Sequence, residues 1–407
     1  MDDWLVSMQS QKKVEDLLKQ YPLCDSCLGR QFSSEHRSLD YASKGRDLRQ
    51  QAGLTNTAEQ QQQQKPCYIC GSLLSNLDRY VELVVNAVKG YEFSSIIIGA
   101  KIPISITEKE DHLRAEMKLR GGETVKTNFT GELNRIVSRR LGVEAKHHVP
   151  DITVVIDTLI DHAEVTPRPL YVYGRYVKTQ RGIPQKRRRC PECRGEGCPK
   201  CNLTGYSTSD SVEQRLSEPL LNLFKAGKVK FTWLGGEDTD SLVLGRGRPF
   251  YAEVSEPMVR KPSNLESVMQ TVNGAIALKE ISILEGVPSS DRGFTVTFES
   301  NAALDQPVAE DVVKKLETAF TGAAVTMTPP GRSSLTKKIH KLTVESVEGD
   351  DKKRLRLRVE CDGGLSIRRF LTGENSEVKP NVAEVLERKV VLDESAPFDI
   401  LDVGFET

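Results

Sequence analysis

Apolar residues recur every three or four positions between residues 73 and 89, the spacing that places side chains on one face of a helix. This segment predicts an amphipathic helix with an apolar face of Leu74, Leu77, Val81, Val84, Val85 and Val88. Similar patterns predict helices near residues 129–141 and 212–225. A helix with one apolar face must pack on another element, so we expect these helices to cover sheets.

Short apolar and β-branched runs predict the strands. They lie at residues 96–98, 102–106, 152–156, 228–233, 276–284, 293–298, 339–345 and 354–360, and a further run covers 163–173. The helix near residue 129 falls between strands, which favours a separate α+β domain over roughly residues 93–185. The later runs predict a largely antiparallel mixed sheet, and the sequence has neither an internal repeat nor a heptad pattern.

At 407 residues the chain is too long for one ordinary domain, and we expect two or three. Its 57 basic residues balance 57 acidic ones, which excludes a strongly charged tail protein but not local patches. An apolar content of 38% suits a globular chain, and no apolar run approaches the roughly 18 residues that span a membrane. The acidic start, Met1-Asp2-Asp3-Trp4, lacks the order of a signal peptide, so we expect a cytosolic protein.

Eight of the nine cysteines fall in Cys-x-x-Cys pairs that form two groups of four. The first group is Cys24, Cys27, Cys67 and Cys70, the second is Cys190, Cys193, Cys198 and Cys201, and Cys361 is left over. Two pairs supply the thiolates of one tetrahedral zinc ion, and a closed set of four predicts structural rather than catalytic zinc. Redox-active pairs are the competing interpretation, but they do not account for four pairs. The glutamine run at 60–64 predicts a solvated loop within the first group.

A basic stretch with interleaved tyrosines precedes the second cysteine group. Its cations are Arg168, Arg175, Lys178, Arg181, Lys186, Arg187, Arg188 and Arg189, and its aromatic residues are Tyr171, Tyr173 and Tyr176. Cations track phosphates and tyrosines stack on exposed bases, so the stretch predicts RNA binding. The alternative is a solvated face with packed aromatic residues. Residues 181–189 are also expected to link the domain before them to the cysteine group.

Residues 234–250 are the best candidate for chemistry, with the sequence Leu-Gly-Gly-Glu-Asp-Thr-Asp-Ser-Leu-Val-Leu-Gly-Arg-Gly-Arg-Pro-Phe. A glycine pair, an acidic group and a glycine-arginine turn follow the strand predicted at 228–233. The segment is neither a P-loop nor a dinucleotide-binding loop, because it lacks the glycine patterns of both. The acidic residues could hold Mg²⁺, but Arg246 and Arg248 would oppose a cation. A carboxylate on such a loop suits a nucleophile or a base.

This motif resembles the active-site motif of pseudouridine synthases, most closely the archaeal and eukaryotic tRNA enzymes that modify the T-loop. Other segments resemble the same family. Residues 23–32 are similar to its N-terminal zinc turn, residues 173–178 and 181–185 to the end of its THUMP-type RNA-binding domain, and residues 360–368 to its late strand-to-helix motif. The resemblance extends over nearly the whole chain.

The resemblance implies roles for individual residues. Asp238 corresponds to the catalytic aspartate, which attacks the target uridine or removes a proton from its ribose. Arg368 corresponds to the basic residue that pairs with this aspartate, and Phe294 to the tyrosine that stacks on the base. Substrate binding is expected from Arg246, Arg248, Arg175, Lys178 and Arg181.

The resemblance also implies the cofactors and partners. The substrate is expected to be the T-arm of tRNA, where one or both of two adjacent uridines are isomerised without an organic cofactor. Zinc is expected to be structural, at one or two sites. Neither a membrane nor a protein partner is implied.

The expected fold is α+β and multidomain. Residues 1–92 form a zinc-containing N-terminal module, and residues 93–185 form a THUMP-like α/β RNA-binding domain. Residues 186–210 form a second zinc knuckle, and residues 211–407 form a pseudouridine synthase catalytic domain on a mixed antiparallel sheet.

Two residues depart from the family's pattern. Gly236 stands where many members have arginine, and Phe294 can stack on a base but cannot accept a proton. The same domains could therefore belong to a non-catalytic tRNA-binding protein or chaperone. An RNA methyltransferase with a THUMP domain would need a glycine-rich cofactor loop after a strand, which we do not find. A zinc-finger protein-folding module would use several cysteine repeats, and the chain has one.

Overall fold

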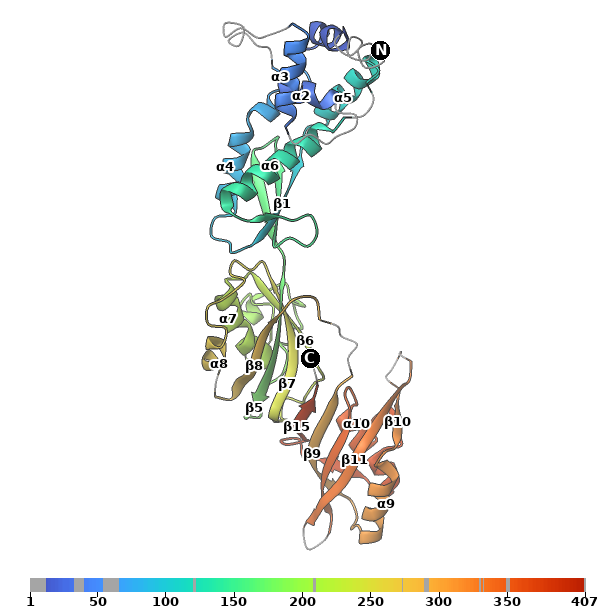
Figure 1. Ribbon diagram of the computed structural model, residues 1–407. Coiled ribbons are helices and arrows are strands. Elements are labelled where there is room, and N and C mark those ends of the chain that lie inside the picture. The colour runs from blue at the N-terminus through green and yellow to red at the C-terminus, as the bar shows by residue number, and fades with distance from the viewer. Residues whose placement is uncertain are drawn as a thin grey trace. The chain divides into compact units, whose positions relative to one another are not determined.

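The computed structural model divides the chain into two compact units, residues 1–168 and 169–407, each with its own apolar core (Figure 1). The structure describes residues 12–32, 40–53, 66–119, 122–207, 210–272, 274–288, 293–328, 331, 333–348 and 352–405. The glutamine run, predicted to be a loop, lies outside this set. Within these ranges no helix has the length and the apolar character needed to cross a bilayer.

The first unit packs helices on a four-stranded sheet. In sheet order its strands are β2 (Glu144–Ala145), β1 (Ser95–Lys101), β3 (Ile152–Asp157) and β4 (His162–Pro167). The two long helices beside the sheet are α4 (Leu77–Ala87) and α6 (Val125–Leu141). The helices predicted over 73–89 and 129–141 are therefore confirmed, the first being a short 3-10 turn, η2 (Leu73–Ser75), followed by α4.

The strand predicted at residues 102–106 is wrong, because helix α5 (Ile104–Glu116) begins there. Pro103 has a φ of −55°, which suits the residue that leads into a helix. The following residues are mostly polar, and Ile104 is exposed, so the three isoleucines of the run do not form a strand face. A pair of apolar residues around a proline was too short a pattern to distinguish the two structures.

The N-terminal helices α2 (Asp25–Gln31) and α3 (Tyr41–Gln51) cross where each has a glycine. A Cβ at Gly29 would lie 2.0 Å from the carbonyl oxygen of Tyr41, and one at Gly45 would lie 2.0 Å from that of Asp25. Only glycine permits this approach. Cys27 and Leu28 of α2 belong to the same core as the sheet residue Ile96, so the segments predicted as a zinc module and as a separate domain share one core.

The second unit is built on one sheet of eleven strands, mostly antiparallel. Its main path runs β13 (Val378–Lys379), β10 (Ala324–Met327), β11 (Leu335–Glu348), β12 (Arg354–Asp362), β9 (Thr295–Leu304), β15 (Asp399–Gly404), β7 (Val243–Ser255), β5 (Leu170–Lys178) and β8 (Ile276–Leu284). Two further strands, β14 (Val390–Leu392) and β6 (Lys228–Trp233), pair with β9 and β7. β15 and β7 are parallel, so the predicted mixed, largely antiparallel sheet is confirmed.

Helices contribute to the core of this sheet. They are α7 (Val212–Phe224), α8 (Ser267–Thr271), α9 (Glu310–Phe320), α10 (Ile367–Thr372) and α11 (Val382–Leu386). Leu216, Phe320 and Phe370 are fully or almost fully buried in the core they share with Phe250 and Phe298 of the sheet. The predicted helix at 212–225 is confirmed as α7, whose first turn is capped by the hydroxyl of Ser211.

The apolar run at residues 163–173 forms parts of two strands in different units. β4 ends at Pro167, which has no N–H to continue the ladder, and β5 begins at Leu170. β5 lies between β7 and β8, near one edge of the large sheet. Residues 170–178 therefore pack with the second unit, whereas the sequence predicted them as the end of a domain at 93–185.

The predicted glycine-arginine turn at residues 245–248 is part of strand β7, where it forms a bulge. The pairing with β5 shifts between Tyr176 and Lys178, so extra residues of β7 oppose this stretch. Gly245 and Gly247 have φ values of +58° and +82°, and a Cβ at Gly247 would lie 2.5 Å from the carbonyl oxygen of Tyr176. The glycines thus let the strand bulge without breaking its pairing.

Two glycine substitutions test the crossing of α2 and α3. Gly45→Ala should destabilise the first unit by about 1 to 3 kcal/mol or more, since the new methyl group meets backbone atoms. The matched control is Gly131→Ala in α6, where a Cβ meets nothing within 4 Å, and it should stabilise by about 0.5 to 1 kcal/mol. Thermal and urea unfolding measure both, and equal effects of the two variants would contradict the close packing at Gly45.

Candidate active site

Asp238 lies on the loop that joins β6 to β7, residues 234–242, which we call the aspartate loop. The loop turns at Gly235, whose φ is +83°. A Cβ at Gly235 would lie 2.6 Å from Nη1 of Arg248 and 3.3 Å from the ring of Phe294. Only glycine fits this conformation and this space. Gly236 has no such restriction, since its Cβ would meet only Gln185, at 3.7 Å.

Arg248, on strand β7, holds the first part of the aspartate loop. Its guanidinium is buried and donates from Nη1 to the carbonyl oxygen of Leu234 at 2.8 Å and from Nη2 to that of Gly236 at 3.0 Å. Its Nε lies 2.7 Å from Oε2 of Glu237, whose side chain is fully buried. Arg248 therefore binds backbone and one carboxylate of the loop.

Lys178, at the end of β5, holds the middle of the loop. Its ammonium is buried and donates to the carbonyl oxygens of Asp238 at 3.0 Å and Thr239 at 3.2 Å, and to that of Ile183 at 2.9 Å. Burial lowers the pKa of Lys178, and the nearby Glu237 carboxylate acts in the opposite direction. The backbone carbonyl oxygen of Asp238, the candidate catalytic residue, is thus bound by a buried cation.

Arg181 holds the last part of the loop. Nη1 donates to the carbonyl oxygen of Asp240 at 2.6 Å, and the guanidinium forms a bidentate pair with Asp399 at 2.6 and 2.7 Å. Asp399 also accepts from the backbone N–H of Leu242 at 2.8 Å. The hydrogen bonds to Asp399 raise the pKa of Arg181, with burial opposing them. Both ends of the loop are therefore fixed to the sheet.

Glu237 is the buried anion that balances these cations. Its carboxylate accepts from the hydroxyl of Tyr176 at 2.7 Å and from the side-chain amide of Gln185 at 3.1 Å, in addition to the pair with Arg248. Burial, followed by the adjacent Glu237 charge, raises the pKa of Tyr176, which keeps the hydroxyl protonated as a donor. A buried polar network in which several side chains bind one carboxylate favours one loop conformation.

Asp238 points its carboxylate at Arg368, as the sequence predicts. Nη2 of Arg368 donates to Oδ2 of Asp238 at 3.0 Å, and the two side chains are 29% and 40% exposed. Arg368 is the second residue of α10 and also pairs with Glu394 at 3.0 Å. Burial acts to lower the pKa of Arg368, but its hydrogen bonds to Glu394 and Asp238 outweigh this and raise it. The carboxylate is thus oriented by a permanent cation and still reachable.

Phe294 borders a cavity of about 910 Å³ at one end of the strands. The cavity is lined by Arg246, Gly293, Phe294, Thr295, Lys337, His340, Asp362, Gly363, Gly404 and Phe405. A Cβ at Gly363 would lie 2.2 Å from the Phe294 ring, so the ring rests on the glycine. The same ring contacts Gly235 of the aspartate loop. The cavity has the size of a ligand site, two aromatic walls and cations at its rim.

The five predicted substrate-binding cations fall into two groups. Arg246 is exposed, pairs with Asp402 and lines the cavity. Arg175 is buried and donates to the carbonyl oxygens of Gly247, Val403 and Phe405. These bonds join β5 to β7 and to the end of β15. The other three, Lys178, Arg181 and Arg248, hold the aspartate loop, as described above. All five predicted cations therefore make contacts within the chain, and of the five Arg246 also lines the cavity.

The sequence did not indicate Glu237, Gln185 or Asp399 as site residues. A signal for buried cations was present in β5, where Arg175 and Lys178 interrupt a run that is otherwise apolar on both faces. A strand with two apolar faces is buried on both sides, so cations within it need internal partners. The partners of these cations lie up to 230 residues away in the chain, and no local pattern shows them.

Both cysteine groups have the geometry of a tetrahedral zinc site. Their ligand sulfur atoms lie within 4.8 Å of one another in each group. Zn–S bonds of about 2.3 Å place tetrahedral thiolates about 3.8 Å apart. The Sγ–Sγ distance is 3.7 Å for Cys24 and Cys70 in the first group, and the second group has distances of 3.7, 3.8 and 3.9 Å. The residues therefore fit zinc with four protein ligands and no open position.

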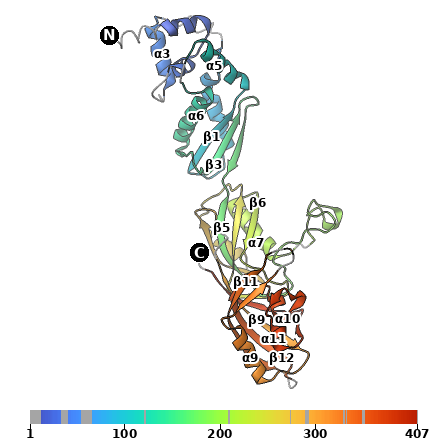
Figure 2. The same cartoon turned by 90° about the vertical axis from the view of Figure 1, so that its right-hand side faces the viewer.

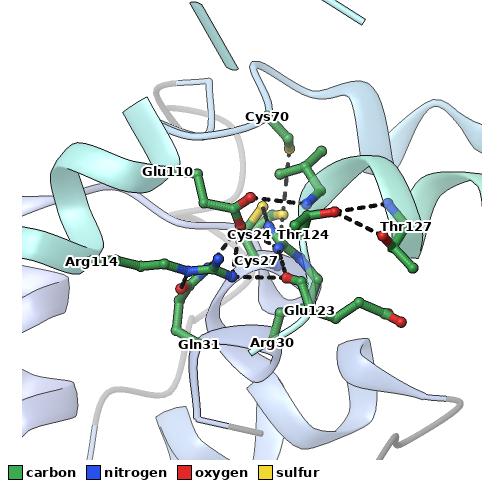
Figure 3. Close-up of polar contacts among 11 residues, drawn as sticks. Cys24, Cys27, Arg30, Gln31, Cys70, Glu110, Arg114, Glu123, Thr124 and Thr127 are labelled. Atoms are coloured by element: carbon green, nitrogen blue, oxygen red, sulfur yellow. Dashed lines mark hydrogen bonds and ion pairs between the residues drawn. The ribbon is translucent and has the colours of Figure 1, made fainter. Parts of the chain in front are cut away.

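The first cysteine group rests on a buried cation (Figure 3). Arg30 is fully buried, donates to Sγ of Cys27 at 3.3 Å and pairs with Glu110. Glu110 in turn accepts from the backbone N–H of Val125 at 3.0 Å, at the start of α6. Four thiolates with one bound Zn²⁺ would carry two negative charges, and Arg30 would balance part of this charge. The zinc turn is thereby linked to the sheet-covering helices.

Comparison with known proteins shows which family the chain matches. The family model described as "Pus10, C-terminal" matches residues 171–404, and that described as "Pus10 THUMP domain, archaeal" matches residues 80–157. A relative from Nitrosopumilus maritimus, called "tRNA pseudouridine synthase Pus10", is 30% identical over 92% of this chain and 93% of its own length. A relative of the same name from Methanopyrus kandleri is 28% identical over 96% of this chain and 98% of its own length.

The mixed sheet, the carboxylate held by an arginine and the cavity bordered by Phe294 thus occur in a chain that matches one family along most of its length. The chain belongs to the Pus10 family. Among solved structures, a chain of the "Cbf5-Nop10-Gar1 Complex" matches 45% of this chain and 43% of its own, at 14% identity and a TM-score of 0.27. That similarity is too low to support an argument.

Removing the buried anion should destabilise the second unit. Glu237→Gln leaves Arg248 buried without its charge partner and should cost about 3 to 5 kcal/mol in urea unfolding. The matched control is Glu394→Gln, because Glu394 pairs with Arg368 but is 82% exposed, and it should cost less than about 0.5 kcal/mol. Equal stability of the two variants would contradict the buried network.

Each cysteine group should bind one zinc ion. Elemental analysis should find two zinc ions in the purified chain, and Cys67→Ser and Cys190→Ser should each lose one. The loss at Cys67 should also destabilise the first unit, because this cysteine belongs to its core. A Cys190→Ser variant that still holds two ions would show that the second group is not a metal site.

Proposed function

We propose that this chain isomerises uridine to pseudouridine in the T-loop of tRNA, with Asp238 as the acting carboxylate. The observation that carries the proposal is the ion pair between Asp238, on the fixed aspartate loop, and Arg368 of α10. Neither residue lines the cavity, but Phe294, which does, contacts Gly235 of the same loop. The relatives' names support tRNA pseudouridine synthesis as the activity. The choice of the T-loop and of Asp238 rests on the resemblance of the motif and on this geometry.

The reaction needs a carboxylate that is ionised and reachable. Oδ2 of Asp238 accepts from Arg368, and among the described residues no hydrogen bond reaches Oδ1. Oδ1 is therefore the atom that attacks the uridine or removes a proton from its ribose. The bond between N1 and C1′ breaks, a bond between C5 and C1′ forms, and the proton leaves C5 while N1 gains one. Atoms and charge balance without a redox partner.

Arg368 orients the carboxylate of Asp238. A guanidinium stays charged at any physiological pH, and its planar donors fix the direction of the carboxylate. Arg368 is held in turn by Glu394, so the pair is positioned from the α10 side as well as from the loop.

Phe294 and Arg246 suit the binding of an extracted nucleotide. Pulling a base from a folded RNA costs a few kcal/mol, and stacking on an aromatic ring recovers about 1 to 3 kcal/mol per base. Phe294 offers its ring at the cavity, and Arg246 offers a cation at the same rim. We propose that the uracil stacks on Phe294 and that a phosphate lies near Arg246. The THUMP-matched segment, residues 80–157, would bind another part of the same tRNA.

The decisive test is site mapping of pseudouridine on unmodified tRNA transcripts. Wild type should form pseudouridine in the T-loop and nowhere else, and Asp238→Asn should lower the rate by at least about 10³-fold, since the amide can neither attack nor accept a proton. The control is Asp311→Asn on α9, an exposed carboxylate outside the site, which should leave the rate unchanged.

Two results would refute the proposal. Turnover that survives Asp238→Asn would remove this residue from its role. A wild type that binds tRNA without forming product would support the non-catalytic binding protein that Gly236 and Phe294 leave open.

A further inference from the structure

The cavity beside Phe294 contains a histidine that is hydrogen-bonded to a carboxylate. Nε2 of His340 lies 2.9 Å from Oδ1 of Asp362, and both residues line the cavity. Their side chains are 33% and 39% exposed, so a nucleotide in the cavity can reach them. The isomerisation proposed above includes the loss of a proton from C5, and Phe294 has no atom that accepts one. A proton acceptor at this wall is therefore a candidate for that step.

Strand pairing places this pair of side chains beside Phe294. β11, β12 and β9 are neighbours in the large sheet (Figure 2). Asp362 lies opposite Thr295 where β12 pairs with β9. The residues beside them are also joined, because Gly363 donates its backbone N–H to the carbonyl oxygen of Phe294 at 2.7 Å. The histidine and the carboxylate therefore lie at the part of the wall that Phe294 joins to the aspartate loop through Gly235.

His340 is the extra residue of a β-bulge in β11. Ile339 and Lys341 pair with two consecutive residues of β12, Cys361 and Glu360. His340, which stands between Ile339 and Lys341, is therefore left out of the pairing. A bulge bends its strand locally and re-aims a side chain, and bulges are over-represented beside active sites. The pairing is thus interrupted at a residue that lines the cavity.

Asp362 determines which ring nitrogen of His340 can accept a proton. Its Oδ2 accepts from the backbone N–H of Lys338 at 2.8 Å, so both oxygens of the carboxylate are bound. Burial acts to raise the pKa of Asp362, but the hydrogen bonds from Lys338 and His340 outweigh it and lower the pKa. The ionised carboxylate accepts from Nε2–H, so in the neutral ring the lone pair is on Nδ1. Among the described residues no hydrogen bond reaches Nδ1 of His340.

The other polar side chains of the cavity wall are less suited to accept a proton. Arg246 and Lys337 are cations with donors only, and the hydroxyl of Thr295 would itself need a base in order to act. Both oxygens of Asp362 already accept hydrogen bonds within the chain. An imidazole is the commonest general base in enzymes. Of these five side chains, His340 thus combines a suitable ring with a carboxylate that holds it.

We propose that Nδ1 of His340 removes the proton from C5 of the target nucleotide, with Asp362 holding the ring. The inference rests on the proposed function, because it assigns a residue to one step of that reaction. After C5 has bonded to C1′, C5 still carries its hydrogen, and a double bond joins C6 to N1. Nδ1 takes the proton, the electron pair of the C5–H bond forms the C5–C6 double bond, and the C6–N1 pair moves to N1. The imidazolium then gives a proton to N1, directly or through water, so atoms and charge balance without a further reactant.

His340→Gln in the full chain tests the proton acceptor, because the amide keeps polar atoms at the position but is not a base. In single turnover on an unmodified tRNA transcript, the variant should be about 10²-fold slower or more, which is the usual contribution of a general base. The dissociation constant for tRNA and the urea-unfolding curve should match those of wild type. The matched control is His162→Gln, at an exposed position on β4 outside the THUMP-matched segment, and it should leave the rate unchanged.

A deuterium isotope effect separates the loss of proton transfer from the loss of a structural contact. The transcript is made with hydrogen or with deuterium at C5 of its uridines, and the two forms are compared in single turnover. When removal of the C5 proton limits the rate, the deuterated form reacts more slowly. The isotope effect should therefore be larger in His340→Gln than in wild type or in His162→Gln, whereas a structural role would leave it unchanged.

Asp362→Asn tests the orientation of the ring without removing the imidazole. The backbone N–H of Lys338 needs an acceptor, so the amide oxygen stays there and the amide nitrogen turns toward His340. That donor places the ring proton on Nδ1, which can then no longer accept one. The rate should fall and the isotope effect should rise, as in His340→Gln. A wild-type rate in Asp362→Asn would overturn the orienting role of Asp362.

A wild-type rate in His340→Gln would overturn the inference. A slower rate with an unchanged isotope effect, or one that weaker tRNA binding accounts for, would overturn it as well and make His340 a structural or binding residue. Either result, together with product from wild type, refutes this inference and leaves the proposed function standing. No product from wild type refutes both, because the step belongs to that reaction.

Discussion

The candidate chemistry depends on one constraint, the attachment of the aspartate loop to the sheet by three cations. Arg248, Lys178 and Arg181 bind the carbonyl oxygens of five loop residues between 234 and 240. A loop of this length would otherwise sample many conformations, and each residue fixed costs about 1 to 2 kcal/mol of backbone entropy. Charge-assisted hydrogen bonds are strong enough to offset that cost. The carboxylate of Asp238 can then be held against Arg368 before any substrate arrives.

The sheet makes this attachment possible because its strands carry two of the three cations. Lys178 ends β5, and Arg248 follows a bulge in the neighbouring strand β7. Buried cations destabilise a core unless they are paired, and Glu237 supplies the buried anion. The glycines of the bulge, Gly245 and Gly247, allow β7 to pass close to β5. The aspartate loop, which carries Asp238, and the bulge of β7, which supports it, therefore pack together as one unit.

Most elements of the fold could be predicted from the sequence, because apolar spacing is a local property. The strands at 228–233 and 276–284 have the predicted bounds, and the pair of Asp238 and Arg368 was expected from the motifs that contain them. The role of the basic stretch could not be predicted in the same way. Cation density indicates charge but not the side of the strand on which a cation lies, so Lys178 was assigned to RNA although its ammonium is buried.

The most direct test of the account is Lys178→Met, which removes the buried ammonium and keeps the length of the side chain. The single-turnover rate and the dissociation constant for tRNA should be measured on the same preparation of the variant. A cooperative urea-unfolding curve should first show that this preparation is folded. If Lys178 positions the aspartate loop, the single-turnover rate of the variant should be at least about tenfold lower than that of wild type. Its dissociation constant for tRNA should stay within about twofold of the wild-type value. An unchanged rate with weaker, less salt-dependent tRNA binding would contradict the account, because it would make Lys178 a phosphate contact.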